Sequence, residues 1–425
     1  MNRSQRNIKP LVLILSLAIL FALPAALPAA LSAAPAAGID YLAQQSSITV
    51  PSEEWTWDSF NDALTVLTDT DIEAFEAGDE PELLLSQAIR NAVLAADYEE
   101  LALSYPEDKI NDRLTTYELE TAGDPETDRY IVTGLDAQLF DAETAAEALQ
   151  GETASSEQLA DLLYNVAEAQ GKTRQYLAYS DDPKIDALLQ QVWQTFAIFS
   201  DEDLNEIGRQ AVEQQLVTGF NVKRGAFDAK FDPDYTLQYG HSSLEHAHQL
   251  MVLLNSEDIR AKVQLEPKVS IYEYLLDWGE PSEPTLTYAV EEVDDDFYLA
   301  HAVEYDLLLE FDTEEEMLRF DELVQTYAKK WEGNEDAVGL IRDSWWQPLY
   351  TSLRDDMPED SYYKIHDLII RSEDNDYRFH SFVLDENLDA TITELESLAD
   401  GLTVESQVRY CNQAFYNYLT GDDFQ

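Results

Sequence analysis

The sequence predicts an α+β protein, in which a helical N-terminal domain precedes a mixed α+β domain with an antiparallel sheet. Between residues 55 and 216, apolar residues recur at spacings of three and four, which is the period of amphipathic helices. Between 217 and 425, segments of alternating apolar residues are separated by polar turns, which is typical of paired strands. We therefore expect two domains, 55–216 and 217–425.

The first 37 residues are typical of a secretory signal peptide. Arg3, Arg6 and Lys9 precede an apolar run over 11–23, and an A-x-A-like cleavage site follows at 34–36. Prolines interrupt the later apolar residues, whereas a spanning helix needs about 20 continuous ones. We expect cleavage, with an uncleaved anchor as the alternative. The mature chain is then secreted, periplasmic or at the cell surface, without an integral membrane domain.

The N-terminal half is expected to serve packing and presentation rather than chemistry. We expect residues 38–54 to be a flexible entry segment. Helical periodicity is clearest over residues 81–103, 156–178, 184–199 and 201–216. This half contains no histidine.

The C-terminal half is expected to supply a sheet with helices packed on it. Strands are expected at 217–227, 259–265, 286–293, 297–311, 363–371 and 377–384. Helices are expected at 243–254, 313–331, 388–399 and 404–418. Within 297–311, alternate residues from His301 to Phe311 share one face of the strand.

Acidic side chains dominate the composition. The chain has 85 Asp and Glu against 26 Lys and Arg, which gives a formal net charge of -59. Such self-repulsion destabilises a compact state at low salt, and at molar salt the Debye length falls to about 3 Å. We infer a saline environment, and we exclude nucleic acid as a partner because it requires a basic surface. A hydrophobic fraction of 45% excludes a disordered acidic chain.

The single cysteine excludes an internal disulfide and any site with several cysteine ligands. Cys411 lies among apolar residues in 408–415. We therefore expect it to be a small core residue rather than a nucleophile.

All six histidines lie between residues 241 and 380, so we expect any acid–base or metal chemistry in the second domain. One alternative is a metal-dependent hydrolase. His241, Glu245 and His248 would share one helical face, and two imidazoles with one carboxylate can hold zinc with an open position. The spacing differs from the H-E-x-x-H pattern of zinc proteases.

A second pattern begins at Ser243. From there to Lys262 the chain resembles the core of the transglutaminase-like superfamily, which includes papain-like thiol hydrolases. In that family a nucleophilic residue opens a buried helix, which is followed by a turn and a strand. The matching positions here are Ser243, Ala247, Leu253, Leu254, Ile259 and Ala261, with Lys262 in place of an arginine. The family's histidine strand is similar to His301–Glu304.

The cysteine position of that family is occupied by Ser243, which departs from the pattern. A hydroxyl is a much poorer nucleophile than a thiolate. The resemblance therefore implies a non-catalytic binding or structural module for a protein or peptide. The alternative that it leaves open is a hydrolase or acyl transferase, with Ser243 as nucleophile, His301 as base and Asp312 or Asp306 as the orienting group. A buried helix followed by a strand is also ordinary α/β packing, which requires no active site.

A glycoside hydrolase is a further alternative, because two carboxylates suffice for that chemistry. Trp278, Trp345, Trp346, Tyr362 and Tyr363 offer rings for sugar stacking. Such rings are more often core residues, and the sequence singles out no carboxylate pair.

The charge predicts that sodium chloride stabilises the fold. Because salt screens the repulsion among carboxylates, the melting temperature should rise steadily from low to molar sodium chloride. Thermal unfolding followed by circular dichroism checks this, with sucrose as an uncharged control solute. A flat salt profile would contradict it.

Overall fold

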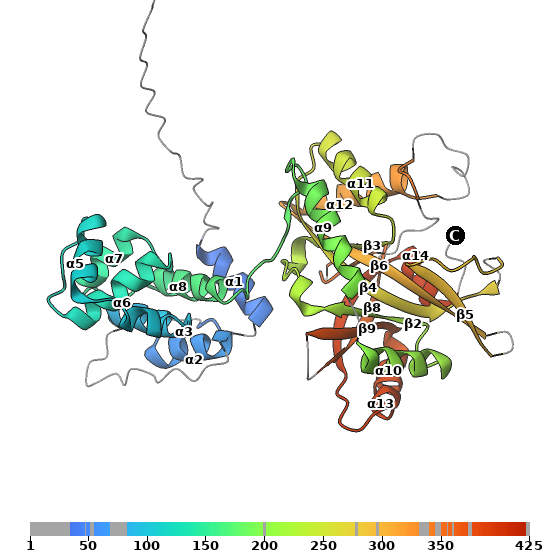
Figure 1. Cartoon of the computed structure of the whole chain (residues 1–425), viewed down its shortest axis with the longest axis horizontal. Helices are drawn as coiled ribbons and strands as arrows, with labels where there is room; N and C mark the ends of the chain where they lie inside the picture. Colours follow the sequence, from blue (N-terminus) through green and yellow to red (C-terminus); the bar gives the residue numbers. More distant parts are fainter. Residues whose placement is uncertain are drawn as a thin grey trace, which may run out of the picture.

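The computed structural model describes residues 35–46, 48–51, 55–68, 83–198, 201–276, 279–294, 297–330, 340–344, 350–354, 356–358, 361–372 and 376–421. The chain forms a helical lobe followed by a lobe built on a sheet (Figure 1), which confirms the predicted α+β class. Apart from its last three residues, the expected signal peptide lies outside the described residues. Among the described helices, none has the length and apolar character needed to cross a membrane.

The helical lobe contains the first eight helices. They are α1 (Pro35–Ser46), α2 (Trp57–Thr68), α3 (Leu85–Ala95), α4 (Glu99–Leu103), α5 (Glu107–Thr116), α6 (Pro125–Asp136), α7 (Ala142–Leu149) and α8 (Ser156–Ala169). Polar side chains fix several helix starts: the Asp124 carboxylate accepts hydrogen bonds from the first turn of α6, and Ser155 and Gln158 form a capping box on α8. One apolar core joins α1, α2, α3, α6 and α8.

The expected flexible entry segment is corrected by the structure. Helix α1 covers its first part, and Tyr41, Leu42 and Ile48 are buried in the core of the helical lobe. The apolar stripe of α1 is short, and its packing partner α8 lies more than 100 residues later. Local sequence therefore did not reveal it.

The second lobe holds all ten strands of the described residues. The strands are β1 (Ala178–Tyr179), β2 (Gly219–Arg224), β3 (Thr236–His241), β4 (Ala261–Glu273), β5 (Tyr288–Asp294), β6 (Phe297–Phe311), β7 (Tyr350–Ser352), β8 (Tyr362–Arg371), β9 (Tyr377–Leu384) and β10 (Glu405–Asn412). The helices are α9 (Ile185–Trp193), α10 (Glu202–Glu213), α11 (Leu244–Ser256), α12 (Glu314–Leu323), α13 (Leu388–Glu396) and α14 (Gln413–Thr420). Short helical turns lie at Gln194–Ile198, Gly225–Phe227, Pro233–Tyr235, Val324–Ala328 and Asp385–Asn387.

Eight of these strands close into an antiparallel barrel in the order β4–β2–β9–β8–β10–β7–β3–β6, with β6 paired back to β4. The closing pair is the longest, and it runs from Ala261 opposite Phe311 to Glu273 opposite Leu299. Strands β1 and β5 extend the sheet outside the barrel, on β4 and β6. Closure gives each barrel strand a neighbour on both sides, which satisfies its backbone hydrogen bonds.

Helices cover the outside of the barrel in two groups (Figure 1). Helices α9, α11 and α12 share an apolar core with β3, β4 and β6, and α10 and α13 share another with β2, β8 and β9. Helix α14 packs against the ends of β8, β9 and β10, and Tyr418 on it hydrogen-bonds Thr218, so α14 crosses one end of the barrel. Cys411 is buried there as expected, and burial raises the pKa of its thiol to about 12.

Strand alternation sends apolar residues outward and polar residues inward. On β4, Val263 and Leu265 belong to the core beneath the helices, while Glu266 is a buried polar residue of the interior. On β6, Leu307 packs outward and Asp306 lies inside. The outward core is therefore conventional, and the unusual feature is a barrel interior filled with charged side chains.

Several expected elements are corrected by the barrel. The helix expected at 404–418 is instead strand β10 followed by α14, and strands β3 and β7 were not expected. Strand β10 pairs with β8 and β7, which are distant in sequence, and such pairing overrides local periodicity. Helices α9 and α10, expected in the helical domain, pack on β4 and β2. The other expected strands and helices are present with shifted ends.

A glycine at the helix–barrel contact gives the first test of this packing. A Cβ atom added to Gly208 on α10 would lie 2.3 Å from the ring of Phe220 on β2. We expect Gly208→Ala to lower the free energy of unfolding by about 1–3 kcal/mol through overpacking, despite alanine's better helix propensity. Urea unfolding in molar salt measures this, with Glu202→Ala on the exposed face of α10 as control. An unchanged or increased stability would contradict the contact.

Candidate functional site

The barrel interior opens into a cavity at the end away from α14. This barrel-mouth cavity has a volume of about 180 Å³. Its lining includes six Lys and Arg side chains but only two carboxylates, whereas the whole chain has 26 Lys and Arg against 85 Asp and Glu. The six cations are Lys223, Arg224, Lys230, Arg371, Arg378 and Arg409. The charge balance of the cavity is therefore the reverse of that of the chain.

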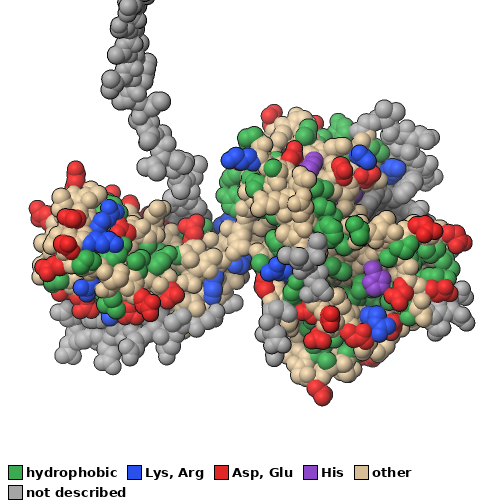
Figure 2. All heavy atoms as spheres, viewed as in Figure 1, with side chains coloured by type: hydrophobic (Ala, Val, Ile, Leu, Met, Phe, Trp, Pro, Cys, Tyr) green, Lys and Arg blue, Asp and Glu red, His purple; other side chains and the backbone are tan. Residues whose placement is uncertain are grey.

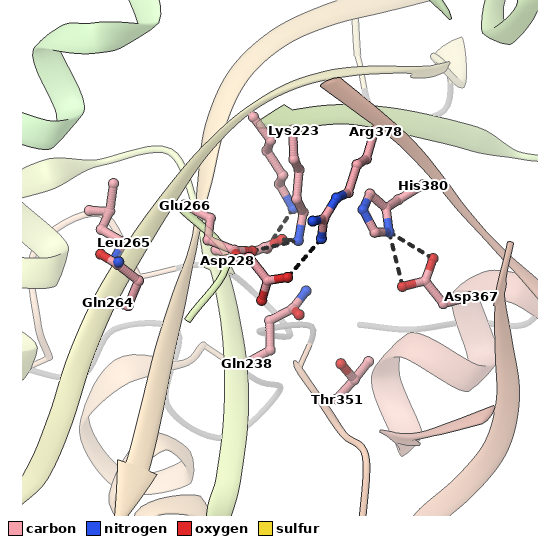
Figure 3. A network of polar contacts seen from close by, with 12 residues as sticks. Lys223, Asp228, Gln238, Gln264, Leu265, Glu266, Thr351, Asp367, Arg378 and His380 are labelled. Atoms are coloured by element: carbon pink, nitrogen blue, oxygen red, sulfur yellow. Dashed lines mark hydrogen bonds and ion pairs between the residues drawn. The ribbon is translucent and has the colours of Figure 1, made fainter. Parts of the chain in front are cut away.

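Adjacent strands position these side chains by their alternation. Arg378 and His380 are two residues apart on β9, so both face the cavity while Phe379 packs outward (Figure 3). Gly225, at the end of β2, leaves room for one of them. A Cβ atom at Gly225 would lie 2.7 Å from a terminal nitrogen of Arg378, so a larger residue would displace that guanidinium.

Four charged side chains form a cluster inside the barrel, and two of them, Lys223 and Glu266, line the cavity. The Lys223 ammonium lies 3.0 Å from the Glu266 carboxylate and 2.5 Å from that of Asp306, and Lys268 lies 2.7 Å from the second Asp306 oxygen. Burial opposes ionisation of Asp306, but Lys223 and Lys268 hold its pKa below the ordinary value. Burial raises the pKa of Glu266, and Lys223 only partly offsets this. Burial also opposes the charge of Lys223, but its two carboxylate partners raise its pKa.

A second group joins β8, β9 and β10. Nδ1 of His380 lies 3.1 Å from each carboxylate oxygen of Asp367, and Nε of Arg409 donates to Asp367 at 3.0 Å. Arg409 also donates to the amide oxygen of Gln238 at 3.2 Å. Burial lowers the pKa of His380 although Asp367 opposes this. Burial disfavours the ionised form of Asp367, but His380 and Arg409 stabilise that form and hold its pKa below the ordinary value.

The rim of the cavity carries one cation, Lys230, that makes no ion pair among the described residues. Arg378 pairs with Asp228 at 2.7 Å and Arg371 with Glu405 at 3.1 Å. Arg224 is opposite Tyr377 in the strand register, so its side chain leaves β2 on the outward face, where its guanidinium carbon lies 5.7 Å from the centre of the Tyr377 ring. Lys230 donates to the carbonyl of Gly171, and burial lowers its pKa.

The residues of the hydrolase alternative are not brought together. The Ser243 hydroxyl donates to Asp343 at 2.7 Å, and Nε2 of His301 lies 3.3 Å from Glu291. Tyr305 donates to the Ser243 carbonyl. His301 precedes Tyr305 by four residues on β6, so the two residues are about 13 Å apart at about 3.3 Å per residue.

The two candidate orienting carboxylates also lie elsewhere. Asp306 faces the barrel interior, whereas His301, at an odd position of β6, faces the other side of the strand. Asp312 is exposed beyond the end of β6. Strand alternation therefore separates the base from Asp306, and distance along the chain separates it from Asp312.

The structure does not bring the residues of the zinc alternative together, and His241 is engaged by other groups. His241 accepts from the Ser243 amide and donates to the Asp343 carbonyl, and its ring stacks on His246 with centroids 4.0 Å apart. His248 has a buried Nε2 without a partner, and Glu245 is exposed. Over the described ranges, no group of three or more His, Cys, Asp or Glu side chains is arranged to hold a metal ion.

The aromatic residues considered for sugar stacking do not form a platform in the described parts of the chain. Tyr362 is buried in the core beneath the helices, and Tyr363 stacks on Tyr416 of α14. Trp278, Trp345 and Trp346 lie outside the described residues.

Sequence reasoning identified none of the cations that line the barrel-mouth cavity. A usable signal was present, since basic residues are rare in this chain and several occupy strands, as in Lys223–Arg224, Arg378 and Arg409. The face of the sheet toward which each basic side chain points depends on strand pairing, however, and strand pairing cannot be read from the sequence.

Comparison with known proteins assigns the chain to no family. No family model, no curated protein and no solved structure matches the chain. The resemblance to transglutaminase-like proteins therefore stays a prediction.

The stacked histidines predict a dependence of stability on pH. Burial, followed by the neighbouring His246, lowers the pKa of His241 to about 2, and burial also lowers the pKa of His246. Below pH 6.5 the unfolded chain therefore binds protons that the folded chain does not. This stabilisation is complete above pH 6.5 and is lost on acidification, by at most about 1.4 kcal/mol per pH unit for each histidine.

We therefore expect His241→Gln to lose stability less steeply than the wild type between pH 6.5 and 5. Urea unfolding at fixed molar salt measures both slopes. Val252→Ala, an exposed change on α11, should keep the wild-type slope. Equal slopes for His241→Gln and the wild type would contradict the assignment.

Proposed function

We propose that the protein binds a small anionic ligand in the barrel-mouth cavity. The observation that carries the proposal is the reversed charge balance of the cavity, whose lining has six Lys and Arg against two carboxylates, with Lys230 at its rim in no ion pair among the described residues. Removing a cation from water without a partner is costly. A phosphate or carboxylate ligand would supply both the charge and the hydrogen-bond acceptors.

The chemistry of the lining favours oxyanions. Guanidinium groups present forked donors that match phosphate and carboxylate oxygens, and Arg378 and Arg409 offer two such groups on inward-facing positions of β9 and β10. A volume of about 180 Å³ is below the range of about 300–1,000 Å³ that is typical of pockets for drug-sized ligands. The cavity therefore fits a phosphate-sized group with a small substituent rather than a polymer.

The charge of the rest of the chain supports this restriction. Asp and Glu side chains are spread over the visible face of both lobes (Figure 2). A long polyanion such as nucleic acid would be repelled along most of its length, whereas a small anion meets only the cationic lining. The protein would act after export, as a secreted, periplasmic or cell-surface binding module. A protein or peptide partner, expected from the sequence, stays a separate prediction.

Isothermal titration with inorganic phosphate tests the proposal. Lys230→Gln should weaken phosphate binding by about 10-fold or more, since a hydrogen bond to a charged group contributes about 1.5–3 kcal/mol. Arg260→Gln is the matched control, because Arg260 pairs with Asp181 on the surface and does not line the cavity. Titrations use the lowest salt at which the protein is folded, because chloride competes.

Two results would overturn this proposal. One is no measurable binding of phosphate, pyrophosphate or citrate by the folded protein. The other is binding whose affinity is the same in the wild type and in Lys230→Gln.

A further inference from the structure

His380 presents one ring nitrogen to the barrel-mouth cavity. Its Nδ1 is engaged by the Asp367 carboxylate at 3.1 Å. His380 lines the cavity. Its Nε2 has no hydrogen-bond partner among the described residues, and it is not one of the fully buried atoms. Figure 3 shows Asp367 on one side of the ring and Lys223 and Arg378 toward the other. Nε2 is therefore the nitrogen that a bound molecule can reach.

The groups around this ring fix its tautomer. Asp367 of β8 faces Nδ1, and Lys223 of β2 and Arg409 of β10 are the nearby cations. A carboxylate accepts hydrogen bonds, so Nδ1 carries the proton and donates it to Asp367. Burial and the two cations disfavour a second proton on the ring and lower its pKa, with Asp367 opposing. The result is a neutral imidazole whose Nε2 lone pair faces the cavity, as a general base requires.

We propose that the cavity hydrolyses small phosphate monoesters, with His380 as the general base and Asp367 as a positioning residue. This proposal rests on the anion binding proposed above, because the same cations hold the phosphoryl group. Lys230 at the rim and Arg378 beside His380 neutralise its oxygens. A monoester retains two negative charges near neutral pH, which matches this lining better than a neutral ester does.

The reaction balances with water as the only co-reactant. Nε2 of His380 accepts a proton from a water molecule as the water oxygen forms a bond to phosphorus. The bond between phosphorus and the alcohol oxygen breaks, and its electron pair leaves with that oxygen. The proton on His380 then passes to the alcohol oxygen, which releases an alcohol and inorganic phosphate and restores the neutral imidazole.

The decisive variant is His380→Asn, whose side-chain amide can still donate to Asp367 but cannot act as a base. Hydrolysis of p-nitrophenyl phosphate by the full chain is followed by absorbance, and phosphate affinity by titration. We expect kcat to fall by about 100-fold or more, which is the usual contribution of a general base. The affinity for phosphate should remain within a few-fold of the wild type.

The barrel supplies a matched control in His366. This histidine lies on β8, faces the outside of the barrel, and pairs with Asp385 at 2.7 Å. His366→Asn removes a second histidine–aspartate pair without touching the cavity, so it should keep wild-type kcat.

The positioning role of Asp367 has its own test. Asp367→Asn should lower kcat more than it changes KM. It should also shift the acidic limb of the pH profile, which a purely structural role would not move.

The outcomes separate the two proposals. Loss of hydrolysis with retained phosphate binding in His380→Asn supports both. Wild-type hydrolysis in His380→Asn overturns the role of His380. Phosphate binding by a wild type that does not hydrolyse p-nitrophenyl phosphate overturns the hydrolase and leaves the binding proposal standing. A folded wild type that neither binds phosphate nor hydrolyses the ester overturns both.

Discussion

The ammonium of Lys223 between Glu266 and Asp306 is the interaction on which the rest of the barrel depends. It joins β2, β4 and β6, and these include the strands that close the barrel. Either carboxylate alone, buried without a cation, would be strongly destabilising, so the three strands must assemble with their inward residues in register. A shift of one residue on β4 would turn Glu266 outward into the apolar core beneath the helices. The buried charges therefore specify the register of the closing strands.

The same charges determine where a ligand can be held. The charge inside the barrel is close to balanced, because Lys223 and Lys268 face Glu266 and Asp306, and Arg409 faces Asp367. The surplus of positive charge lies at the rim. The protein thus separates its charge, with carboxylates over the visible surface (Figure 2) and cations prominent in the lining of one cavity. Such an arrangement excludes long polyanions and admits small ones.

The helical lobe contributes to this opening through α1. Tyr41 donates to the carbonyl of Lys230, and Gln45 donates to that of Phe231 and lines the cavity. Arg174, in the segment that joins the lobes, lies over the Tyr41 ring at 4.0 Å and pairs with Glu310 of β6 at 2.8 Å. The loop that carries Lys230 is therefore held from both lobes, so the entry segment expected to be flexible is in fact part of the support of the cavity.

The sequence by itself determined the fold class, the acidic character and the core role of Cys411, because hydrophobic periodicity and composition act locally. It also gave β6, β8 and β9 nearly to the residue, since their alternation is strong. The tertiary structure decided what depends on partners distant in the chain. Strand β10 has an ambiguous local pattern and became a strand only between β8 and β7. Ser243 and His301 look related in sequence, yet strand geometry directs them to different neighbours. Lys223, Asp367 and His380 look unrelated and meet inside the barrel, because only closure of the sheet decides which face of each strand is enclosed.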